Sequence, residues 1–283
     1  MRLIGMRTPG DSTTYIGRLD GDDHVFPVTD VATFWSDTPS WLAKAAELTD
    51  GRRRLDSVEQ RPPVPDSARV ICIGLNYKAH AAEGSFQVPQ FPTLFGRWTS
   101  SLTVSGTSAP VPAGEAGLDW EGEVAAYVGA PLCETDPDTA RAAVLGYSTF
   151  NDLTARKAQK LTAQWTLGKN GDRSGPMGPL VTTDEVGDLR DGLSVRTRVN
   201  GTVVQNGNTR DMIFDIGHVL ALISETFTLN PGDVIATGTP EGVGYVRNPP
   251  WLLQPGDVVE VEIERLGLLT TPIVDATTRH SDC

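Results

Sequence analysis

The sequence has few cysteines, no excess of positive charge and no long apolar run. Its three cysteines among 283 residues lack Cys-x-x-Cys spacing, so neither a disulfide framework nor a zinc site is predicted. Thirty-six acidic against 24 basic residues give a net charge of -12, which disfavours nucleic acid as a partner. No segment approaches the roughly 18 apolar residues that span a bilayer, and no signal-peptide core follows the first residues. We therefore expect a cytoplasmic protein without a membrane partner.

The composition is that of a globular protein with a sizeable core. Apolar residues make up 39% of the sequence and charged residues 21%, which is ordinary for globular chains. A polar, proline-rich stretch, Arg61 to Asp66, is typical of a boundary. We predict a small N-terminal α/β domain over residues 1–65 and a catalytic domain with a C-terminal tail over residues 66–283. The expected elements of the first part are Thr14 to Arg18 and His24 to Val28 as strands, and Thr33 to Leu48 as a helix.

Short strands dominate the pattern after residue 66. Two corners, Asn230 to Asp233 and Gln254 to Asp257, place Pro and then Gly at the centre of a turn, which favours a type II turn because glycine tolerates positive φ. Strands do not alternate regularly with helices, as a βαβ fold requires, so the predicted fold class is strand-dominated α+β. The expected strands are Val70 to Ile73, Glu121 to Val128, Ser194 to Val199, Val234 to Ala236 and Val258 to Ile263, and the expected helices are Asp152 to Thr162 and Asp211 to Thr226.

Two glutamates, Glu121 and Glu123, are spaced to lie on one face of a strand. Two like charges that lie so near each other are destabilising unless a cation or solvent screens them, and hard divalent cations favour oxygen ligands. Asp152 follows a short apolar segment and would complete a set of three carboxylates. The pattern indicates a divalent-metal site on these three residues.

Other interpretations of the same residues are open. Glu-x-Glu on a strand is more often a solvated face, and Glu260, Glu262 and Glu264 in this chain show the same alternation, where we expect only water. Asp152 is also a suitable helix N-cap.

A histidine and a glutamate lie three residues apart, at His80 and Glu83. On a helical turn the carboxylate would lie beside the imidazole, where it can fix the tautomer and raise the basicity of the ring. Such a pair can activate water as a general base. The alternative is a charge pair that only stabilises a helix.

Several motifs occur together in this chain, and as a set they resemble the fumarylacetoacetate hydrolase family over roughly residues 66 to 275. They are Gly74 to Glu83 (GLNYKAHAAE), Asp119 to Gly129 (DWEGEVAAYVG), Gly146 to Arg156 (GYSTFNDLTAR), Gly168-Lys169, Gly178-Pro179, Asn200 to Phe214 (NGTVVQNGNTRDMIF) and Thr228 to Gly244 (TLNPGDVIATGTPEGVG).

The resemblance implies a mixed β-roll catalytic domain, a homodimer, and a bound Mg²⁺ or Mn²⁺, with Ca²⁺ possible. It implies that Glu121, Glu123 and Asp152 are the metal ligands and that His80 and Glu83 form a water-activating dyad on a mobile lid. Lys169 and Thr239 would meet oxygens of the substrate, and backbone NH groups around Gly238 would position a carboxylate. Gln205 and Asn208 lie in a matching segment. The family commonly has Lys in a Phe-x-Lys motif, where this chain has Arg97. The positive charge is retained, but it is carried by a planar, forked guanidinium instead of an ammonium. We expect Arg97 to bind substrate.

The function predicted is divalent-metal-dependent hydrolysis of a carbon–carbon bond in a small diketo acid, such as an acylpyruvate or a fumarylacetoacetate-like compound. The same residues could decarboxylate an oxaloacetate-like acid, or act as an isomerase or hydratase, because these reactions share a metal-stabilised enolate. An alternative from another class is a non-catalytic module in which the metal only holds loops together.

Overall fold

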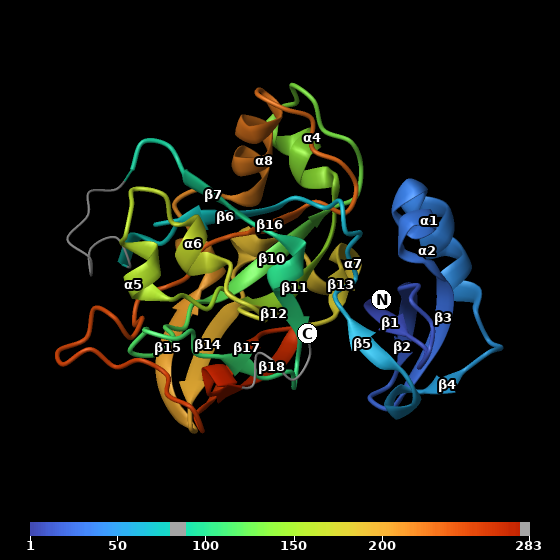
Figure 1. Ribbon diagram of the computed structural model, residues 1–283. Helices are drawn as coiled ribbons and strands as arrows, with labels where there is room; N and C mark the ends of the chain where they lie inside the picture. Colours follow the sequence, from blue (N-terminus) through green and yellow to red (C-terminus); the bar gives the residue numbers. More distant parts are fainter. Residues whose placement is uncertain (80–88, 278–283) are drawn as a thin grey trace.

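Strands in two sheets make up most of the ordered structure in the computed structural model, which describes residues 1–79 and 89–277 (Figure 1). The larger sheet follows the order β4-β3-β2-β1-β13-β11-β10-β16-β6-β7, and β5, β8 and β12 attach to it. Its strands are β1 (Arg2–Arg7), β2 (Tyr15–Asp20), β3 (His24–Asp30), β4 (Arg53–Arg54), β5 (Glu59–Arg61), β6 (Val70–Gly74), β7 (Thr93–Arg97), β8 (Leu102–Val104), β10 (Gly122–Val128), β11 (Val144–Asn151), β12 (Gly175–Met177), β13 (Leu180–Thr182) and β16 (Val234–Ala236).

The smaller sheet follows the order β15-β14-β17-β18-β9, and the helices are short. Its strands are β9 (Ala109–Pro110), β14 (Ser194–Val199), β15 (Thr202–Asn208), β17 (Val258–Ile263) and β18 (Gly267–Val274). The α-helices are α1 (Val31–Ser36), α2 (Thr38–Glu47), α4 (Pro137–Ala142), α5 (Arg156–Gln159), α6 (Thr166–Lys169), α7 (Thr183–Val186) and α8 (Ile216–Ser224). The 3₁₀ turns are η1 (Leu55–Ser57), η2 (Thr99–Ser101), η3 (Leu189–Asp191) and η4 (Thr209–Asp211).

Strand β10 lies inside the larger sheet with both of its faces covered, which explains why its sequence is apolar from Val124 to Val128, after the buried Glu123. Val124, Ala126 and Val128 pack into a cluster with side chains of β14, β17 and α8. Ala125 and Tyr127 face the other way, into a cluster with the N-terminal part. By contrast, β14 and β17 alternate half-buried with buried residues, as expected for strands with one covered face.

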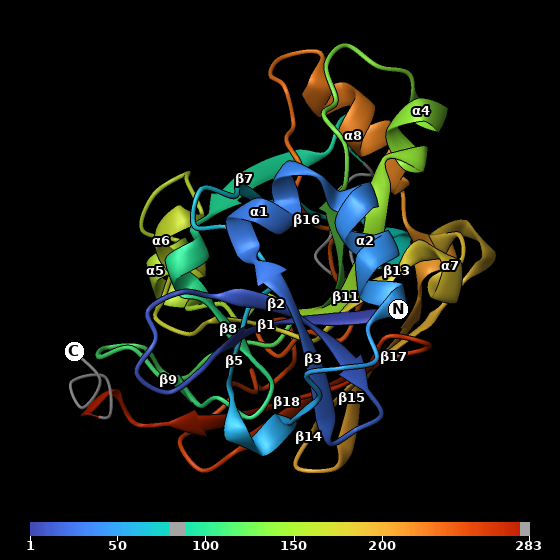
Figure 2. The ribbon, with the colours of Figure 1, turned by 90° about the vertical axis from the view of Figure 1, so that its right-hand side faces the viewer.

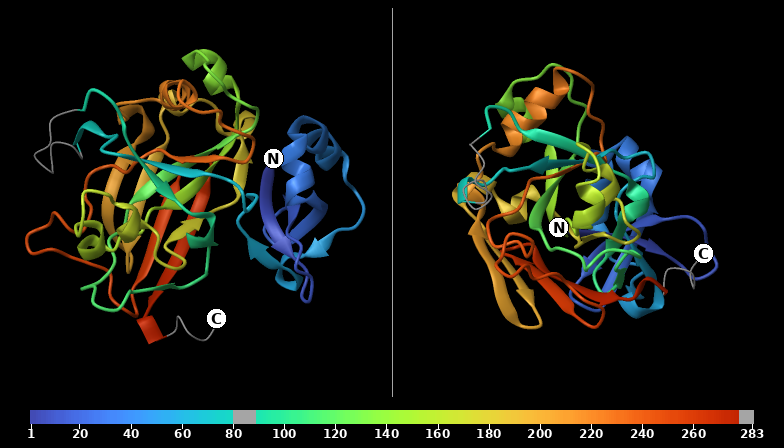
Figure 3. Two further views of the ribbon diagram at one scale, coloured as in Figure 1. Left: turned by 45° about the horizontal axis from the view of Figure 1, so that its top comes forward. Right: turned by 60° about the vertical axis from the view of Figure 1, so that its left-hand side comes forward.

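The N-terminal part, β1 to β5 with α1 and α2, forms one end of the larger sheet; it lies in front in Figure 2 and on the right in the left-hand view of Figure 3. It joins the rest of that sheet through β1, which pairs with β13, with Leu3 opposite Leu180. The ring of Trp35 stacks on Tyr127 of β10, with centroids 6.3 Å apart and planes at 13°. The predicted boundary at residue 65 stays a prediction, but the apolar contacts cross it.

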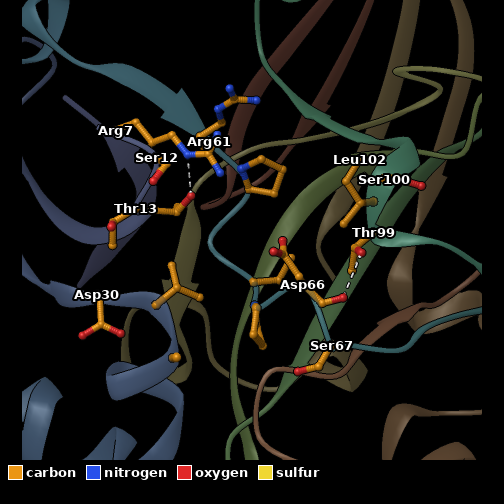
Figure 4. Close-up of a pocket in the computed structure, with 16 residues that line it drawn as sticks. Arg7, Ser12, Thr13, Asp30, Arg61, Asp66, Ser67, Thr99, Ser100 and Leu102 are labelled. Atoms are coloured by element: carbon orange, nitrogen blue, oxygen red, sulfur yellow. Dashed lines mark hydrogen bonds between the residues drawn. The ribbon is translucent and has the colours of Figure 1, made fainter. Parts of the chain in front are cut away.

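A cavity of about 600 Å³ lies between part of this N-terminal region and the rest of the chain (Figure 4). Arg7 and Asp30 line one wall, and Thr99 and Leu102 line the opposite wall. Asp30 already caps α1 by accepting a hydrogen bond from the Thr33 amide (2.9 Å). None of the three carboxylates predicted to hold a metal lines this cavity, and it shares no lining residue with the cavity beside those carboxylates.

The strand-dominated α+β class is confirmed, and the strands expected at Ser194 to Val199, Val234 to Ala236 and Val258 to Ile263 have those bounds. The helix expected over Asp152 to Thr162 is wrong, because α5 begins only at Arg156. In the two described ranges, no helix is long and apolar enough to cross a membrane.

Two other helices are also shorter than expected. The stretch from Thr33 to Leu48 is broken at Asp37, whose side chain caps α2 by accepting from the Ser40 amide. The stretch from Asp211 to Thr226 contains only α8 and the end of η4, since Asp215 caps α8.

We predict that Trp35→Ala destabilises the whole chain in one cooperative transition. The lost stacking and the cavity left beside Tyr127 should cost about 3–5 kcal/mol. Thermal unfolding followed by circular dichroism and tryptophan fluorescence measures this. Phe227→Ala is the control, because Phe227 is 40% exposed. Two separate transitions, with only the first one shifted, would show instead that residues 1–65 unfold independently.

Candidate metal centre

The pairing of β10 with β11 brings the three predicted carboxylates together. Gly122 lies opposite Asn151 in this antiparallel pair, and the Asp152 amide donates to the Glu121 carbonyl (2.9 Å). Glu123 follows two residues later. One oxygen from each of Glu121, Glu123 and Asp152 lies within 4.8 Å of the others, and all three residues are buried. The convergence predicted from the sequence is confirmed.

Lys169, at the end of α6, bridges two of these carboxylates. Its Nζ lies 2.6 Å from Glu121 Oε2 and 2.5 Å from Asp152 Oδ2. Burial lowers the pKa of Lys169, but the attraction of Asp152 and Glu121 outweighs it and raises the pKa above the ordinary value. The ammonium is therefore charged at neutral pH.

Arg97 holds Asp152 from the opposite side. Its Nε and Nη2 donate to Asp152 Oδ1 at 3.0 and 2.6 Å. Its Nη1 donates to the hydroxyls of Ser101 (3.2 Å) and Ser174 (2.7 Å). The side chain is fully buried and does not line the cavity beside the carboxylates. The structure thus places Arg97 behind a carboxylate, away from the space in which the sequence interpretation had it bind substrate.

Arg156 pairs with Glu121 and with a further buried acid, Asp119. Its Nη2 lies 2.7 Å from Glu121 Oε1 and 2.7 Å from Asp119 Oδ2. Burial lowers the pKa of Arg156, but the two carboxylates outweigh it and raise the pKa above the ordinary value. The arginine thus joins a carboxylate of the candidate centre to the loop before β10.

Glu123 has the least compensated charge of the three carboxylates. Its Oε2 accepts a hydrogen bond from the Gly238 amide (2.9 Å), and no basic side chain in the described ranges forms an ion pair with it. Burial raises the pKa of Glu123 well above the ordinary value, and the charges of Asp152 and Glu121 raise it further. A carboxylate in this position gains most from an added cation.

The donor set fits a hard divalent cation. Four carboxylates and three basic side chains are in contact here, so the charge is four negative plus three positive, or -1, when all are ionised. A divalent ion would bring the group to +1 while balancing Glu123, and carboxylate oxygens are the ligands that such ions prefer. The residues counted are Asp119, Glu121, Glu123, Asp152, Arg97, Arg156 and Lys169.

The turn after β16 supports the carboxylates through its backbone. Gly238 has φ +92°, and a Cβ there would lie 2.8 Å from the Asn76 Cβ, so only glycine fits. Its amide donates to Glu123, which accounts for one of the NH groups that the sequence interpretation assigned to a substrate carboxylate. The hydroxyl of Thr239 donates to the Gly122 carbonyl (2.9 Å) and accepts from Gln205 Nε2 (2.9 Å). Thr239 still lines the cavity, where its oxygen can only accept.

A cavity of about 310 Å³ opens beside Glu121, Glu123 and Lys169. Its outer walls are mainly apolar and aromatic, which favours the carbon skeleton of a small ligand. Sequence interpretation does not assign most of the lining residues to the site, and four of these are used below. Arg156 lies in a quoted motif and Lys160 in the helix expected over Asp152 to Thr162, whereas the other two lie on segments without a pattern. The four are Arg156, Lys160, Trp165 and Tyr245.

The remaining expectations from the sequence have different outcomes, and one of them is not tested by the structure. His80 and Glu83 lie outside the described residues. Asp152 is not a helix N-cap, since α5 has Ala155 in that position. Glu262 does not face water alone, because Arg198 Nη2 lies 2.8 Å from its carboxylate. Asn208 caps η4 by accepting from the Arg210 amide (3.1 Å) and does not line the cavity beside the carboxylates.

Comparison with known proteins gives a consistent result. The family model described as fumarylacetoacetate (FAA) hydrolase C-terminal matches residues 69–274. A putative hydrolase from Burkholderia multivorans is 44% identical over 275 residues, covering 94% of this chain and 96% of the relative. Mitochondrial oxaloacetate tautomerase Fahd2a from Rattus norvegicus is 35% identical, covering 97% and 92%. A 2,4-didehydro-3-deoxy-L-rhamnonate hydrolase from a Sphingomonas species is 37% identical, covering 89% of each chain.

A solved structure has the same fold along almost the whole chain. The crystal structure of a putative HpcE protein from Mycobacterium smegmatis superposes with a TM-score of 0.84 at 32% identity. The match covers 98% of this chain and all of the other. The N-terminal part is therefore included in the similarity, beyond the residues that the family model matches.

We predict that Glu123→Gln stabilises the metal-free protein at alkaline pH. Because the folded-state pKa of Glu123 lies above its unfolded value, its contribution to stability is lost as the pH rises through the folded pKa. Glutamine keeps an acceptor for the Gly238 amide but carries no charge. The thermal midpoint in chelator should therefore rise at about pH 8, by roughly 2–4 °C per kcal/mol of relieved repulsion, and less at about pH 5.

The control is Glu47→Gln, which changes an exposed glutamate at the end of α2. It should leave the midpoint nearly unchanged at both pH values. A lower midpoint for Glu123→Gln than for the wild type at about pH 8 would mean that the negative charge is already balanced without a metal.

Proposed function

The chain belongs to the fumarylacetoacetate hydrolase family, whose members are enzymes that include hydrolases and isomerases, and from this premise we propose a function. We propose that the protein binds one divalent cation on Glu121, Glu123 and Asp152 and hydrolyses a carbon–carbon bond in a small diketo acid. The observation that carries the proposal is the buried carboxylate triad with Lys169 at the wall of an apolar cavity.

The chemistry has two electrostatic parts. A divalent cation held by the triad would polarise the carbonyl oxygens of an oxo acid and stabilise the negative charge that develops on them. Lys169 supplies a second positive charge at a fixed place, since two carboxylates hold its ammonium. The apolar walls, with Phe95 and Trp165, exclude water and so strengthen these interactions.

Hydrolysis also needs an activated water, and we assign this task to His80 with Glu83 on the family resemblance. His80 would accept a proton from water, whose oxygen bonds to the carbonyl carbon distant from the acid group. The bond between that carbon and the methylene carbon then breaks, and its electron pair goes to the oxo-acid fragment as an enolate. That fragment takes up the proton, and the acyl fragment leaves as a carboxylic acid.

A second candidate is the interconversion of keto and enol forms of an oxaloacetate-like acid. The rat relative is named an oxaloacetate tautomerase. The residues that would stabilise an enolate all lie within the described ranges, and this reaction needs no attacking water. The two candidates therefore differ in their dependence on the water-activating pair.

We expect His80→Ala to lose hydrolysis of acylpyruvates by at least about 100-fold, because the general base is removed. Wild type with Mg²⁺ or Mn²⁺ should release pyruvate and a carboxylic acid, as measured by chromatography, and chelator should stop this release. His218→Ala is the control, since His218 is 64% exposed on α8. If the wild type releases no pyruvate but speeds the keto–enol conversion of oxaloacetate, the tautomerase candidate replaces the hydrolase.

We expect Lys169→Met to bind the divalent cation more tightly while turnover falls by about 100-fold to 1,000-fold. Removing the ammonium takes away a positive charge that competes for Glu121 and Asp152, and it also removes a charge that would stabilise the transition state. Calorimetric titration and kcat measure the two effects. Lys44→Met, at an exposed lysine of α2, is the control. Weaker cation binding by Lys169→Met would contradict this assignment.

A further inference from the structure

One oxygen of Asp152 is fully occupied by a guanidinium. Arg97 gives two N–H groups to Asp152 Oδ1, from Nε at 3.0 Å and from Nη2 at 2.6 Å. A carboxylate oxygen has two lone pairs in the plane of the group, and two donors use both. Oδ2 of the same carboxylate is the oxygen that faces Lys169 (2.5 Å).

Arg97 cannot easily turn away from this position. Its Nη1 donates to the Ser174 hydroxyl (2.7 Å) and to the Ser101 hydroxyl (3.2 Å), and its Nη2 also reaches the Leu153 carbonyl (3.2 Å). A Cβ at Gly175 would lie 3.2 Å from the Arg97 Cδ, so the backbone packs closely against the side chain. The guanidinium is therefore fixed along with the oxygen it holds.

We propose that Arg97 restricts Asp152 to a single ligand oxygen, Oδ2, and that this restriction makes the centre select a small six-coordinate cation such as Mg²⁺ or Mn²⁺ over Ca²⁺. Ca²⁺ takes six to eight oxygens and commonly binds carboxylates through both oxygens, whereas Mg²⁺ prefers six in octahedral geometry. The inference rests on the proposed metal centre and goes beyond it by assigning the selectivity to a residue behind a ligand.

A second arginine, Arg156, restricts the ligand oxygens of Glu121 in a similar way. Arg156 Nη2 lies 2.7 Å from Glu121 Oε1, while Lys169 approaches Oε2. Chelation of a cation by both oxygens of Glu121 would require Arg156 to move. Arg156 lines the cavity and also holds Asp119, so its replacement would change several features together. Arg97 is the cleaner test.

The test is Arg97→Lys, which retains the charge but replaces the fork by one nitrogen. A lysine ammonium cannot give two N–H groups to Oδ1 and also reach Ser174 and Ser101 in the fixed geometry of a guanidinium. Mg²⁺ and Ca²⁺ binding to the purified chain is measured by calorimetric titration. We expect the Ca²⁺ affinity to rise relative to the Mg²⁺ affinity by about tenfold, in the range seen when a group that orients a metal ligand is changed.

The control is Arg198→Lys, which makes the same change in a half-exposed pair with Glu262. It should leave the affinity ratio unchanged. An unchanged ratio in Arg97→Lys, with both cations still bound, would overturn the inference while leaving the proposed function intact. If the wild type binds neither cation, it is the proposed metal centre itself that fails.

A second measurement counts the waters on bound Mn²⁺, from the broadening of its electron paramagnetic resonance lines in ¹⁷O-enriched water. Arg97→Lys should bind fewer waters than the wild type, because Asp152 would then supply both oxygens. Ser174→Ala keeps the guanidinium but removes its shortest anchor, and it serves if Arg97→Lys does not fold. It should shift the affinity ratio in the same direction by a smaller factor, and no shift in that case would count against the inference.

Discussion

Mutual repulsion among buried carboxylates is the constraint around which this protein is arranged. Taking a charged group out of water is costly unless an opposite charge compensates it, and several acids in one place increase the cost. Arg97, Arg156 and Lys169 each lie against a carboxylate at 2.5–2.7 Å. In the described ranges, the two basic residues that are almost fully buried, Arg97 and Lys169, therefore both lie at this site. Glu123 stays without such a partner among the described residues, and this leaves the site in need of one more positive charge.

The packing of the two sheets holds the carboxylates of the candidate metal centre in fixed positions. Glu121 comes directly before β10 and Glu123 is its second residue, and the neighbouring strands β11 and β16 are themselves buried. The N-terminal part covers one face of β10 through Trp35, and the smaller sheet and α8 cover the other. Behind the turn at Gly238, the side-chain Nδ2 of Asn76 donates to the Thr237 carbonyl (2.8 Å) and to the Phe214 carbonyl (3.0 Å). Carboxylates on so enclosed a strand cannot separate to relieve their repulsion.

How much of this can be predicted from the sequence depends on whether a feature is local. The two Pro-Gly corners were predictable because Gly232 and Gly256 do adopt positive φ, at +92° and +98°. The triad was predictable because a strand period places two glutamates together. The role of Arg97 was not, since residues 55 positions apart meet only through the sheet. The helix expected from Asp152 failed because Asp152 bonds to Arg97 and Lys169, and a tertiary ion pair outweighs a local capping preference.

The net charge of the residues at the site also bears on the order in which the cation and an anionic substrate bind. Without a divalent cation the contacting acids and bases sum to -1 when all are ionised, and to zero when Glu123 is protonated, so their net charge does not attract an anionic oxo acid. With the cation the sum is +1, and Lys160, whose Nζ lies 3.5 Å from the centre of the Tyr245 ring, adds positive charge at the wall. The proposed function therefore favours binding of the cation before the anion, because the cation makes the net charge of these residues positive. The aromatic walls then contribute contacts with the carbon skeleton of the ligand, which add specificity to this electrostatic attraction.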